Sequence, residues 1–350
     1  MRTLIDVLMN KFKLYLIVST VVAILFSCNK ADGPAIIPPR DYQVQYDTDI
    51  ETIRDYLKTY YIESITSSSD YSDQDIKFTK IPVGNPANFP RIWDSPLLDS
   101  TKVTYEEVEY TVYYLKLRLG SATGISPTSV DDVLASYNGS YLSYKSIEVD
   151  EVSVDSLTIN PFEYIPFPDN FLSLNQTIRG WKKIFPLFKS GQINSTTGPN
   201  PVLYSDFGAG VMFLPSGLAY FSVGSGTIPA YAPLVFSFKL YEVRRADQDN
   251  DGILSIYEDT NQDGDFTNDD TDGDGTQDYL DVDDDGDGYF TKTETKYTDS
   301  AGTVRYYPYN GAAVDDPLTP LVDESKGVPS CSLDYITPTR VRRYLDKTCH

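Results

Sequence analysis

The stretch that decides the fold is residues 171–192, FLSLNQTIRGWKKIFPLFKSGQ. Within it, apolar side chains from Ile178 to Phe188 recur at spacings of three and four, the period of an amphipathic helix. Pro186 interrupts that period, so we expect a short helix that bends or ends early. The segment therefore predicts a single short helix.

Residues 105–243, on both sides of that helix, alternate between apolar and polar side chains. Examples are YTVYYLKLRL at 110–119 and LVFSFKLYEV at 234–243, with Gly, Pro, Ser and Asn clusters between such runs. This period of two is typical of β-strands. The composition agrees, because 28 Tyr and 22 Pro against three Met and two Trp favour strands and turns. We expect the helix to lie on a sheet.

Four short strings follow one another along residues 108–244, roughly 40% of the chain. They are Tyr-x-Gly from Tyr137, Ile-x-Gly-Trp from Ile178, Pro-Ser-x-Leu-Ala-Tyr from Pro215, and IPAYAPLVFSFKLYEV at 228–243. In this order and spacing, they resemble the FKBP-type peptidyl-prolyl cis-trans isomerase family. The resemblance implies an α+β fold, in which a twisted antiparallel sheet wraps around one short helix and leaves an apolar pocket between them.

The same resemblance implies the residues of a substrate site. Trp181 would form the floor of the pocket, while the Tyr220 hydroxyl and the Ile178 backbone N–H would donate to a substrate carbonyl. The implied site residues are Tyr137, Ile178, Trp181, Tyr220, Phe236 and Asp155, with Phe171 and Ile228 as further wall candidates. For each aromatic residue, ordinary core packing is the alternative interpretation.

Prolyl isomerisation suits a chain with few catalytic side chains. Rotation about the amide faces a barrier of about 18–20 kcal/mol. A dry aromatic cup can lower it without acid, base, metal or cofactor. The single histidine, His350, argues against a Ser-His-Asp triad. We therefore expect an isomerase with no catalytic cofactor.

The chain departs from the family pattern in three places. Phe221 stands where the family usually has Gly, and the family's Phe-Asp-Ser is matched only in part, by Val154-Asp155-Ser156, which comes late in the sequence. An insertion separates Gly191 from Val211. These departures bear on catalytic rate more than on fold. They leave two interpretations open: a folding enzyme of the cell envelope, or a non-catalytic binding or adhesion module on the same scaffold.

Residues 247–294 hold 18 acidic residues against one basic residue, Lys292. Four successive stretches, which begin 12, 11 and 13 residues apart, match the calcium-loop pattern D-x-[DN]-x-[DN]-G. The expected ligands are Asp247, Asp249, Asp251 and Glu258 in loop 1, Asp259, Asn261, Asp263 and Asp270 in loop 2, Asp270, Asp272, Asp274 and Asp281 in loop 3, and Asp283, Asp285, Asp287 and Glu294 in loop 4. Such back-to-back loops resemble thrombospondin type 3 repeats, which implies structural Ca²⁺. A disordered acidic linker is the alternative.

The N-terminus reads as a sorting signal. Basic residues precede an uncharged run at 14–26, which is short for a membrane span and suits a signal peptide. The run ends at Leu25-Phe26-Ser27-Cys28, which resembles a lipobox and implies a diacylated Cys28. A plain transmembrane anchor and a secretory signal with an incidental cysteine are the alternatives. We expect a lipoprotein on the periplasmic or cell-surface side of the envelope, with the outer membrane favoured.

The remaining sequence completes a domain plan. Residues 47–62 predict an amphipathic helix, and a disulfide between Cys331 and Cys349 is expected. The plan is a signal peptide at 1–27, a tether at 28–46, a helix with an irregular lead-in at 47–107, an isomerase domain at 108–244, calcium loops at 247–294 and a tail at 295–350. A net charge of −22 argues against nucleic acid. The expected partners are proline-containing segments of exported proteins, the membrane through a lipid anchor, and calcium ions.

Overall fold

The computed structural model describes residues 38–82, 88–149, 152–194, 202–299, 301–309, 327–335 and 337–349. Its two units are Met1–Arg40 and Asp41–His350. The predicted signal peptide, Cys28 and most of the predicted tether lie outside the described residues. Over the described ranges, no helix combines the length and apolar character needed to cross a membrane.

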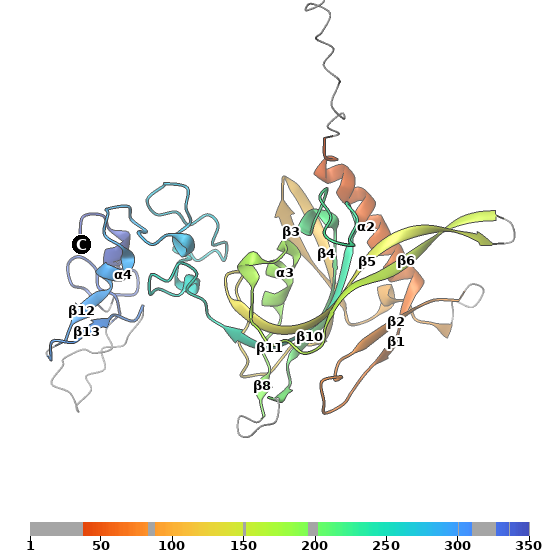
Figure 1. Ribbon diagram of the computed structural model, residues 1–350, viewed down its shortest axis with the longest axis horizontal. Coiled ribbons are helices and arrows are strands. Elements are labelled where there is room, and N and C mark those ends of the chain that lie inside the picture. The colour runs from red at the N-terminus through yellow and green to blue at the C-terminus, as the bar shows by residue number, and fades with distance from the viewer. Residues whose placement is uncertain are drawn as a thin grey trace, which may run out of the picture. The chain divides into compact units, whose positions relative to one another are not determined.

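A curled, seven-stranded antiparallel sheet forms the centre of the second unit (Figure 1). Six strands pair in the order β3-β4-β10-β11-β5-β6, and β7 pairs with β5. The strands are β3 (Leu98–Tyr105), β4 (Val108–Arg118), β5 (Asp132–Val149), β6 (Val152–Ile165), β7 (Leu172–Ser173), β10 (Gly208–Leu214) and β11 (Leu234–Arg244). The β5–β6 hairpin extends as a long ribbon beyond its neighbours (Figure 1).

The central strand β10 is buried along its whole length. Its side chains alternate between the two faces of the sheet. Met212 and Leu214 belong to one apolar cluster, and Val211 and Phe213 to another. Both faces of the sheet are therefore covered.

The short helix α3 (Arg179–Ile184) covers the first face, where Trp181 and Ile184 enter the apolar cluster. Pro186 lies in the first turn of the 3₁₀ helix η4 (Phe185–Leu187), which continues the chain directly. A proline tolerates the first turn because it has no N–H to leave unpaired there. The predictions of one short helix on a sheet and of an early end at the proline are confirmed.

Helix α2 (Tyr42–Thr59) covers the second face through Ile53, Tyr56 and Leu57. It begins five residues before the predicted start, because the Asp41 carboxylate caps it by accepting the Val44 N–H at 3.0 Å. It ends before Tyr60, where the chain becomes the strand β1 (Tyr60–Ile65). The predicted helical range of 47–62 was therefore displaced toward the C-terminus.

The stretch expected to be an irregular lead-in contains regular structure. Strand β1 pairs with β2 (Ile76–Lys80), and η2 (Ile92–Asp94) buries Ile92. Strand β3 pairs with β4 from Leu98↔Leu115 to Tyr105↔Val108. The sheet thus begins before residue 108, and the polar composition of this region concealed its strands. Two short strands, β8 (Gln192–Ile193) and β9 (Tyr204–Ser205), pair across the predicted insertion.

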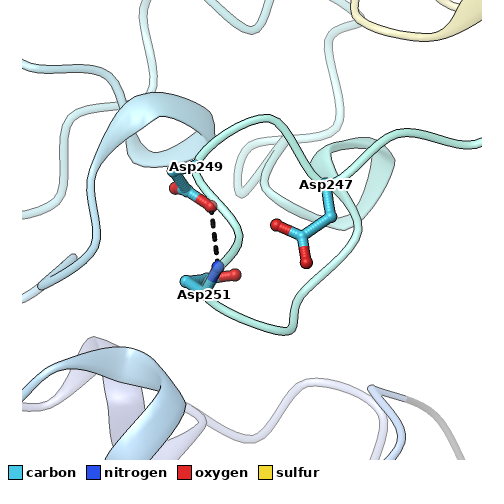
Figure 2. A group of neighbouring side chains, drawn as sticks. All are labelled: Asp247, Asp249 and Asp251. Atoms are coloured by element: carbon cyan, nitrogen blue, oxygen red, sulfur yellow. Dashed lines mark hydrogen bonds between the residues drawn. The ribbon is translucent and has the colours of Figure 1, made fainter.

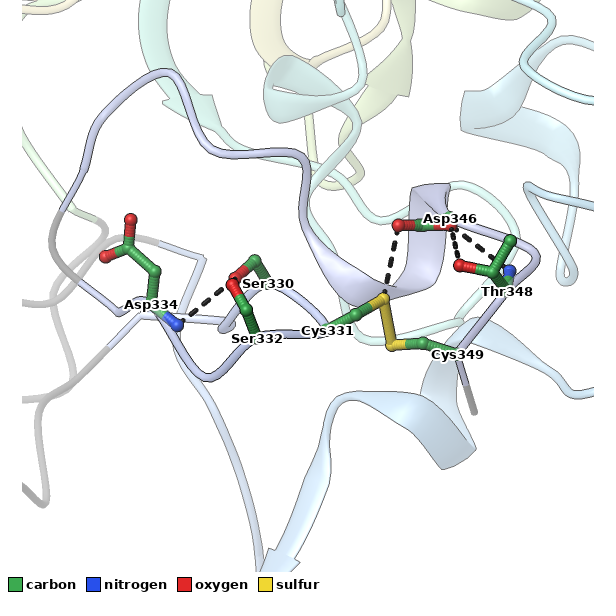
Figure 3. Close-up of a disulfide and its surroundings, with 7 residues drawn as sticks. All are labelled: Ser330, Cys331, Ser332, Asp334, Asp346, Thr348 and Cys349. Atoms are coloured by element: carbon green, nitrogen blue, oxygen red, sulfur yellow. Dashed lines mark hydrogen bonds between the residues drawn. A yellow bond between two sulfur atoms is a disulfide. The ribbon is translucent and has the colours of Figure 1, made fainter.

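The acidic segment holds little regular structure, as expected. Its helical turns are η6 (Ser255–Tyr257), η7 (Asp278–Leu280) and α4 (Thr291–Glu294), and the tail adds β12 (Lys296–Thr298), β13 (Val304–Tyr306) and η8 (Arg343–Leu345). The expected disulfide joins Cys331 to Cys349, whose Cα atoms are 5.6 Å apart (Figure 3). The tail also packs onto loop 1 through a cluster of Ile253, Val328 and Tyr344.

Candidate functional site

A cavity of about 250 Å³ lies between α3 and the sheet. The buried Trp181 indole meets two aromatic rings almost at right angles: Tyr137 at 4.9 Å and 84°, and Phe236 at 5.2 Å and 88°, measured between ring centroids and planes. Edge-to-face pairs of this kind hold aromatic side chains in fixed orientations. The three rings form a rigid apolar cup.

The other lining residues come from the ends of neighbouring elements. The full set is Tyr137, Glu163, Leu172, Gln176, Thr177, Ile178, Trp181, Tyr220 and Phe236. Ile178 is the N-cap residue of α3, and Tyr220 follows the 3₁₀ helix η5 (Ser216–Leu218). The structure thus brings five of the six site residues expected from the sequence to one cavity.

The sixth expected residue, Asp155, does not line the cavity. It pairs with Ser146 across the β5–β6 hairpin and accepts a hydrogen bond from the Ser146 hydroxyl at 3.2 Å. The carboxylate in the cavity belongs to Glu163, which sequence reasoning missed. Phe162 precedes it and packs edge-on against Phe236 at 5.6 Å. A Phe-Glu pair in place of the family's Phe-Asp was the signal that could have found it.

Glu163 and Tyr137 form a hydrogen-bonded pair at the cavity. The Tyr137 hydroxyl donates to Glu163 Oε2 at 2.9 Å. Burial first, and then this carboxylate, raise the pKa of Tyr137 above its ordinary value of 10.0. The phenol proton is thus directed to Glu163.

Helix α2 anchors the loop that carries Tyr220. The buried Asp49 carboxylate accepts hydrogen bonds from the Ser216 N–H at 2.7 Å and the Ser216 hydroxyl at 2.6 Å. Gln45 donates to the same side chain at 2.6 Å. Since a charged acceptor strengthens hydrogen bonds, this contact fixes the start of the loop.

Phe221 adopts a left-handed backbone conformation with φ of 42°. Glycine enters this region most easily, which accounts for the family's Gly at this position. The Phe221 ring stacks on Tyr42 of α2, with centroids 4.0 Å apart and planes 6° apart. Phe221 is absent from the cavity lining, so this departure ties the loop to α2 and does not narrow the cup.

The two further wall candidates, Phe171 and Ile228, also lie outside the cavity lining. The Phe171 ring lies 4.5 Å from the Arg244 guanidinium, while its neighbour Leu172 lines the cavity. Successive residues of an extended chain point to opposite sides, so Leu172 faces the cavity and Phe171 faces away from it. Ile228 packs in the core cluster and pairs with Ser225 in a turn.

The four acidic loops repeat one local geometry. In each, the sixth residue is a glycine whose N–H donates to the carboxylate of the first residue. These bonds are Gly252 to Asp247 at 3.2 Å, Gly264 to Asp259 at 2.9 Å, Gly275 to Asp270 at 3.0 Å and Gly288 to Asp283 at 3.0 Å. The glycines have φ values of 102°, 81°, 98° and 91°. Because only glycine adopts this conformation easily, the predicted spacing has a structural cause.

Three of the loops gather carboxylates within 4.8 Å of one another. The groups are Asp247, Asp249 and Asp251 (Figure 2), Asp270, Asp272 and Asp274, and Asp283, Asp285 and Asp287. In loop 2, the side chains of Asp259 and Asn261 accept from the Asp263 N–H, with an amide in place of one carboxylate. Asp281, expected to close loop 3, belongs to none of these groups.

The loops have the chemistry of a hard cation site. Glu258 and Glu294 are buried, and neither carboxylate has a hydrogen-bond partner among the described residues. Burial first, and then neighbouring carboxylates, raise the pKa of Glu258 to about 11 and those of Asp249 and Glu294 to about 8. Calcium accepts six to eight oxygens and offsets such charge, so these residues fit the ion.

The fold and site define an α+β protein with a curled antiparallel sheet, few helices and an aromatic cavity, an architecture compatible with an FKBP-like fold. A protein family model described as the BamM C-terminal region matches residues 248–321. A peptidyl-prolyl cis-trans isomerase from Pseudomonas syringae is similar over 60% of this chain and 100% of its own, at 12% identity and a TM-score of 0.28. FkpA from Escherichia coli is similar over 38% of this chain and 48% of its own, at 23% identity and a TM-score of 0.24. A comparison with curated proteins finds no match.

Proposed function

We propose that this chain is an FKBP-type peptidyl-prolyl cis-trans isomerase, held at the cell envelope through a lipidated Cys28 and carrying calcium-binding loops behind its isomerase domain. The observation that carries the proposal is the aromatic cup, in which the edges of Tyr137 and Phe236 meet the indole of Trp181. A proline ring is compact, apolar and small enough for a cavity of about 250 Å³.

In this proposal, the cup favours the twisted amide over either planar isomer. Bound proline loses water from its preceding carbonyl, which weakens the resonance that sets the barrier. The Tyr220 hydroxyl and the Ile178 N–H then donate to carbonyl oxygens of the bound segment and hold its proline in the cup. In the described part of the chain, neither group has a hydrogen-bond acceptor of its own, whereas Tyr137 is committed to Glu163. No side chain has to gain or lose a proton.

Calcium would act as a structural ion away from the amide chemistry. The carboxylates of the four loops would hold it, and its charge would offset their mutual repulsion. We propose proline-containing segments of exported proteins as substrates, presented on the periplasmic or surface side of the outer membrane. The anchor is tested by mass spectrometry of the mature N-terminal peptide, which should carry acyl chains on Cys28, and by the release of Cys28→Ser from membranes.

A protease-coupled prolyl-isomerisation assay on the full-length chain in detergent tests the activity. Trp181→Leu should abolish the acceleration because it removes the floor of the cup, and Tyr220→Phe should lower kcat/KM by about tenfold because one donor is lost. Trp93→Phe is the matched control, since Trp93 packs against Tyr113 and Lys58 outside the cavity. An accelerated wild type with an equally active Trp181→Leu variant would refute the assigned site.

The control variant also separates catalysis from mere binding. Because the chain has two tryptophans, Trp93→Phe leaves Trp181 as the only indole, and its emission should change when a proline peptide enters the cup. Emission that titrates with peptide in a folded protein that gives no acceleration would favour the non-catalytic binding module. No change in emission and no acceleration would overturn both functions.

A further inference from the structure

Besides the three clusters that lie within single loops, a fourth acidic cluster joins two loops that are distant in sequence. Asp251 and Glu258 of loop 1 and Asp284 of loop 4 each offer a carboxylate oxygen, and these oxygens lie within 4.8 Å of one another. Asp284 is not a ligand position of the loop pattern. It lies between Asp283 and Asp285, which belong to the cluster of loop 4, in a turn that the Gly286 N–H closes by donating to the Asp283 carbonyl at 3.0 Å.

The three carboxylates are buried and lack partners for the oxygens that face one another. Their exposed fractions are 2% for Asp251, 1% for Glu258 and 1% for Asp284. Asp251 Oδ2, both Glu258 oxygens and Asp284 Oδ1 have no hydrogen-bond partner within the described ranges. An isolated buried carboxylate is costly unless it is paired or bound to a metal, so three together favour the binding of a cation.

A hydrogen bond on the side away from the cluster orients the Asp284 carboxylate. Its Oδ2 accepts a hydrogen bond from the Thr291 hydroxyl at 3.2 Å, which leaves Oδ1 directed at the cluster. Outer contacts of this kind orient the ligands of protein metal sites. Loops 1 and 4 also meet at a second point, where Lys292 Nζ donates to the Asn250 carbonyl at 3.0 Å. The meeting of the two loops therefore does not depend on the carboxylates alone.

We infer that Asp251, Glu258 and Asp284 form a calcium site that clips loop 1 to loop 4, an inference that rests on the proposed calcium binding of the loops. Calcium ligands lie about 2.3–2.6 Å from the ion, so oxygens on one ion lie within about 5 Å of one another, as these do. Asp251 also belongs to the cluster of loop 1, and Glu258 is the residue expected to close that loop, so Asp284 is the ligand that ties loop 4 to the ion site of loop 1. A calcium ion bound here would hold loop 1 and loop 4 together.

The chain offers a matched control in Asp278. It is also buried, but Thr271 donates to both of its oxygens, from its N–H at 2.7 Å and its hydroxyl at 2.8 Å. Asp278 belongs to no metal cluster among the described residues. Asp278→Asn and Asp284→Asn therefore remove the same charge at similar depth, and only the second removes a proposed ligand.

The test is calcium titration of the full-length chain by calorimetry after chelation, combined with hydrogen exchange. Asp284→Asn should bind one ion fewer or bind one ion at least about tenfold more weakly, while Asp278→Asn should match the wild type. In Asp284→Asn, calcium should also fail to protect residues 247–258 from exchange, although protection of loop 3 persists. Wild-type calcium binding that Asp284→Asn leaves unchanged would overturn the clip alone, whereas a wild type that binds no calcium would overturn the calcium loops and the clip together.

Discussion

The sheet domain and the acidic segment of residues 247–294 bury opposite kinds of side chain. Around the sheet, residues such as Tyr110, Leu115 and Phe213 are fully buried in apolar clusters. In the acidic segment, the buried groups include the carboxyl groups of Glu258 and Asp284. Apolar burial stabilises a fold by itself, at about 25 cal/mol for each Å² removed from water, whereas buried like charges oppose it. One region therefore has an apolar core of its own, whereas under the proposed function the other needs a bound cation.

Removal of calcium by chelation should produce the largest difference between the sheet domain and the acidic segment. Calcium that binds only the folded segment stabilises it by about 2.7 kcal/mol for each site at a concentration of 100 times Kd. With EGTA, we expect residues 247–294 to become open to protease and hydrogen exchange while the sheet keeps its protection. Mass spectrometry of the cleavage sites measures this. Equal protection of both regions without calcium would contradict the distinction.

Phe188→Ala should destabilise the sheet domain. Phe188 is fully buried and packs edge-on against Phe238 at 4.9 Å between centroids. Its loss should lower the free energy of unfolding of the sheet domain by about 3–5 kcal/mol, with calcium or with EGTA. Phe290→Ala in loop 4 is the control, because that side chain is 60% exposed. Urea unfolding followed by Trp fluorescence checks the result, and a loss seen only with EGTA would count against an independent core.

Asp49→Asn should lower both the stability of the sheet domain and the activity at the aromatic cavity, with an effect of intermediate size. Removing the charge weakens the bonds from Ser216 and should cost about 1.5–3 kcal/mol. Because Ser216 begins the loop that carries Tyr220, kcat/KM should fall as well. Asp47→Asn is the matched control on the same helix, since Asp47 is exposed and its carboxylate accepts a hydrogen bond from the neighbouring Gln43 side chain at 2.7 Å. Steady-state assays that find the two variants equally active would show that the anchor does not position Tyr220.

The pH dependence of stability should have opposite signs in the calcium-bound and calcium-free acidic segment. Burial is the main cause that raises the pKa of Asp285 to about 6, that of Asp251 to about 7 and that of Asp249 to about 8, from an ordinary value of 3.8. In EGTA, these groups stabilise the fold fully below pH 3.8, and that contribution is lost as the pH rises through 6 to 8.

With calcium bound, the carboxylates must be ionised, so protons compete and affinity should fall as the pH drops. Thermal unfolding of the acidic segment between pH 4 and 8, followed by hydrogen exchange, measures both slopes. Parallel slopes with calcium and with EGTA would mean that these groups are not ligands.

The sequence predicted the parts of this molecule in which local pattern and tertiary burial agree. The short helix around Trp181, the strands that pair around it and the spacing of Gly252 and its three counterparts all follow from such patterns. It did not predict β1 and β2, whose polar residues lie at the surface. Their strand character comes from pairing with each other, which a single segment does not reveal.

Two site residues escaped prediction for a similar reason. Glu163 reaches the cavity because the long β5–β6 hairpin carries Asp155 far along the ribbon, and only the register Gly139↔Glu163 reveals this. Asp284 was hidden in a run of three aspartates, where the loop pattern assigns its two neighbours. Which way the middle carboxylate points depends on a loop that is distant in sequence.

The most direct test of the account is exchange NMR on a short Xaa-Pro peptide with a catalytic amount of the full-length chain. Free peptide interconverts over tens to hundreds of seconds, so it gives no cis–trans cross-peaks at mixing times of about one second. We expect cross-peaks with the wild type and with Trp93→Phe, and none with Trp181→Leu. Folded wild-type protein that produces no cross-peaks would contradict the isomerase assignment.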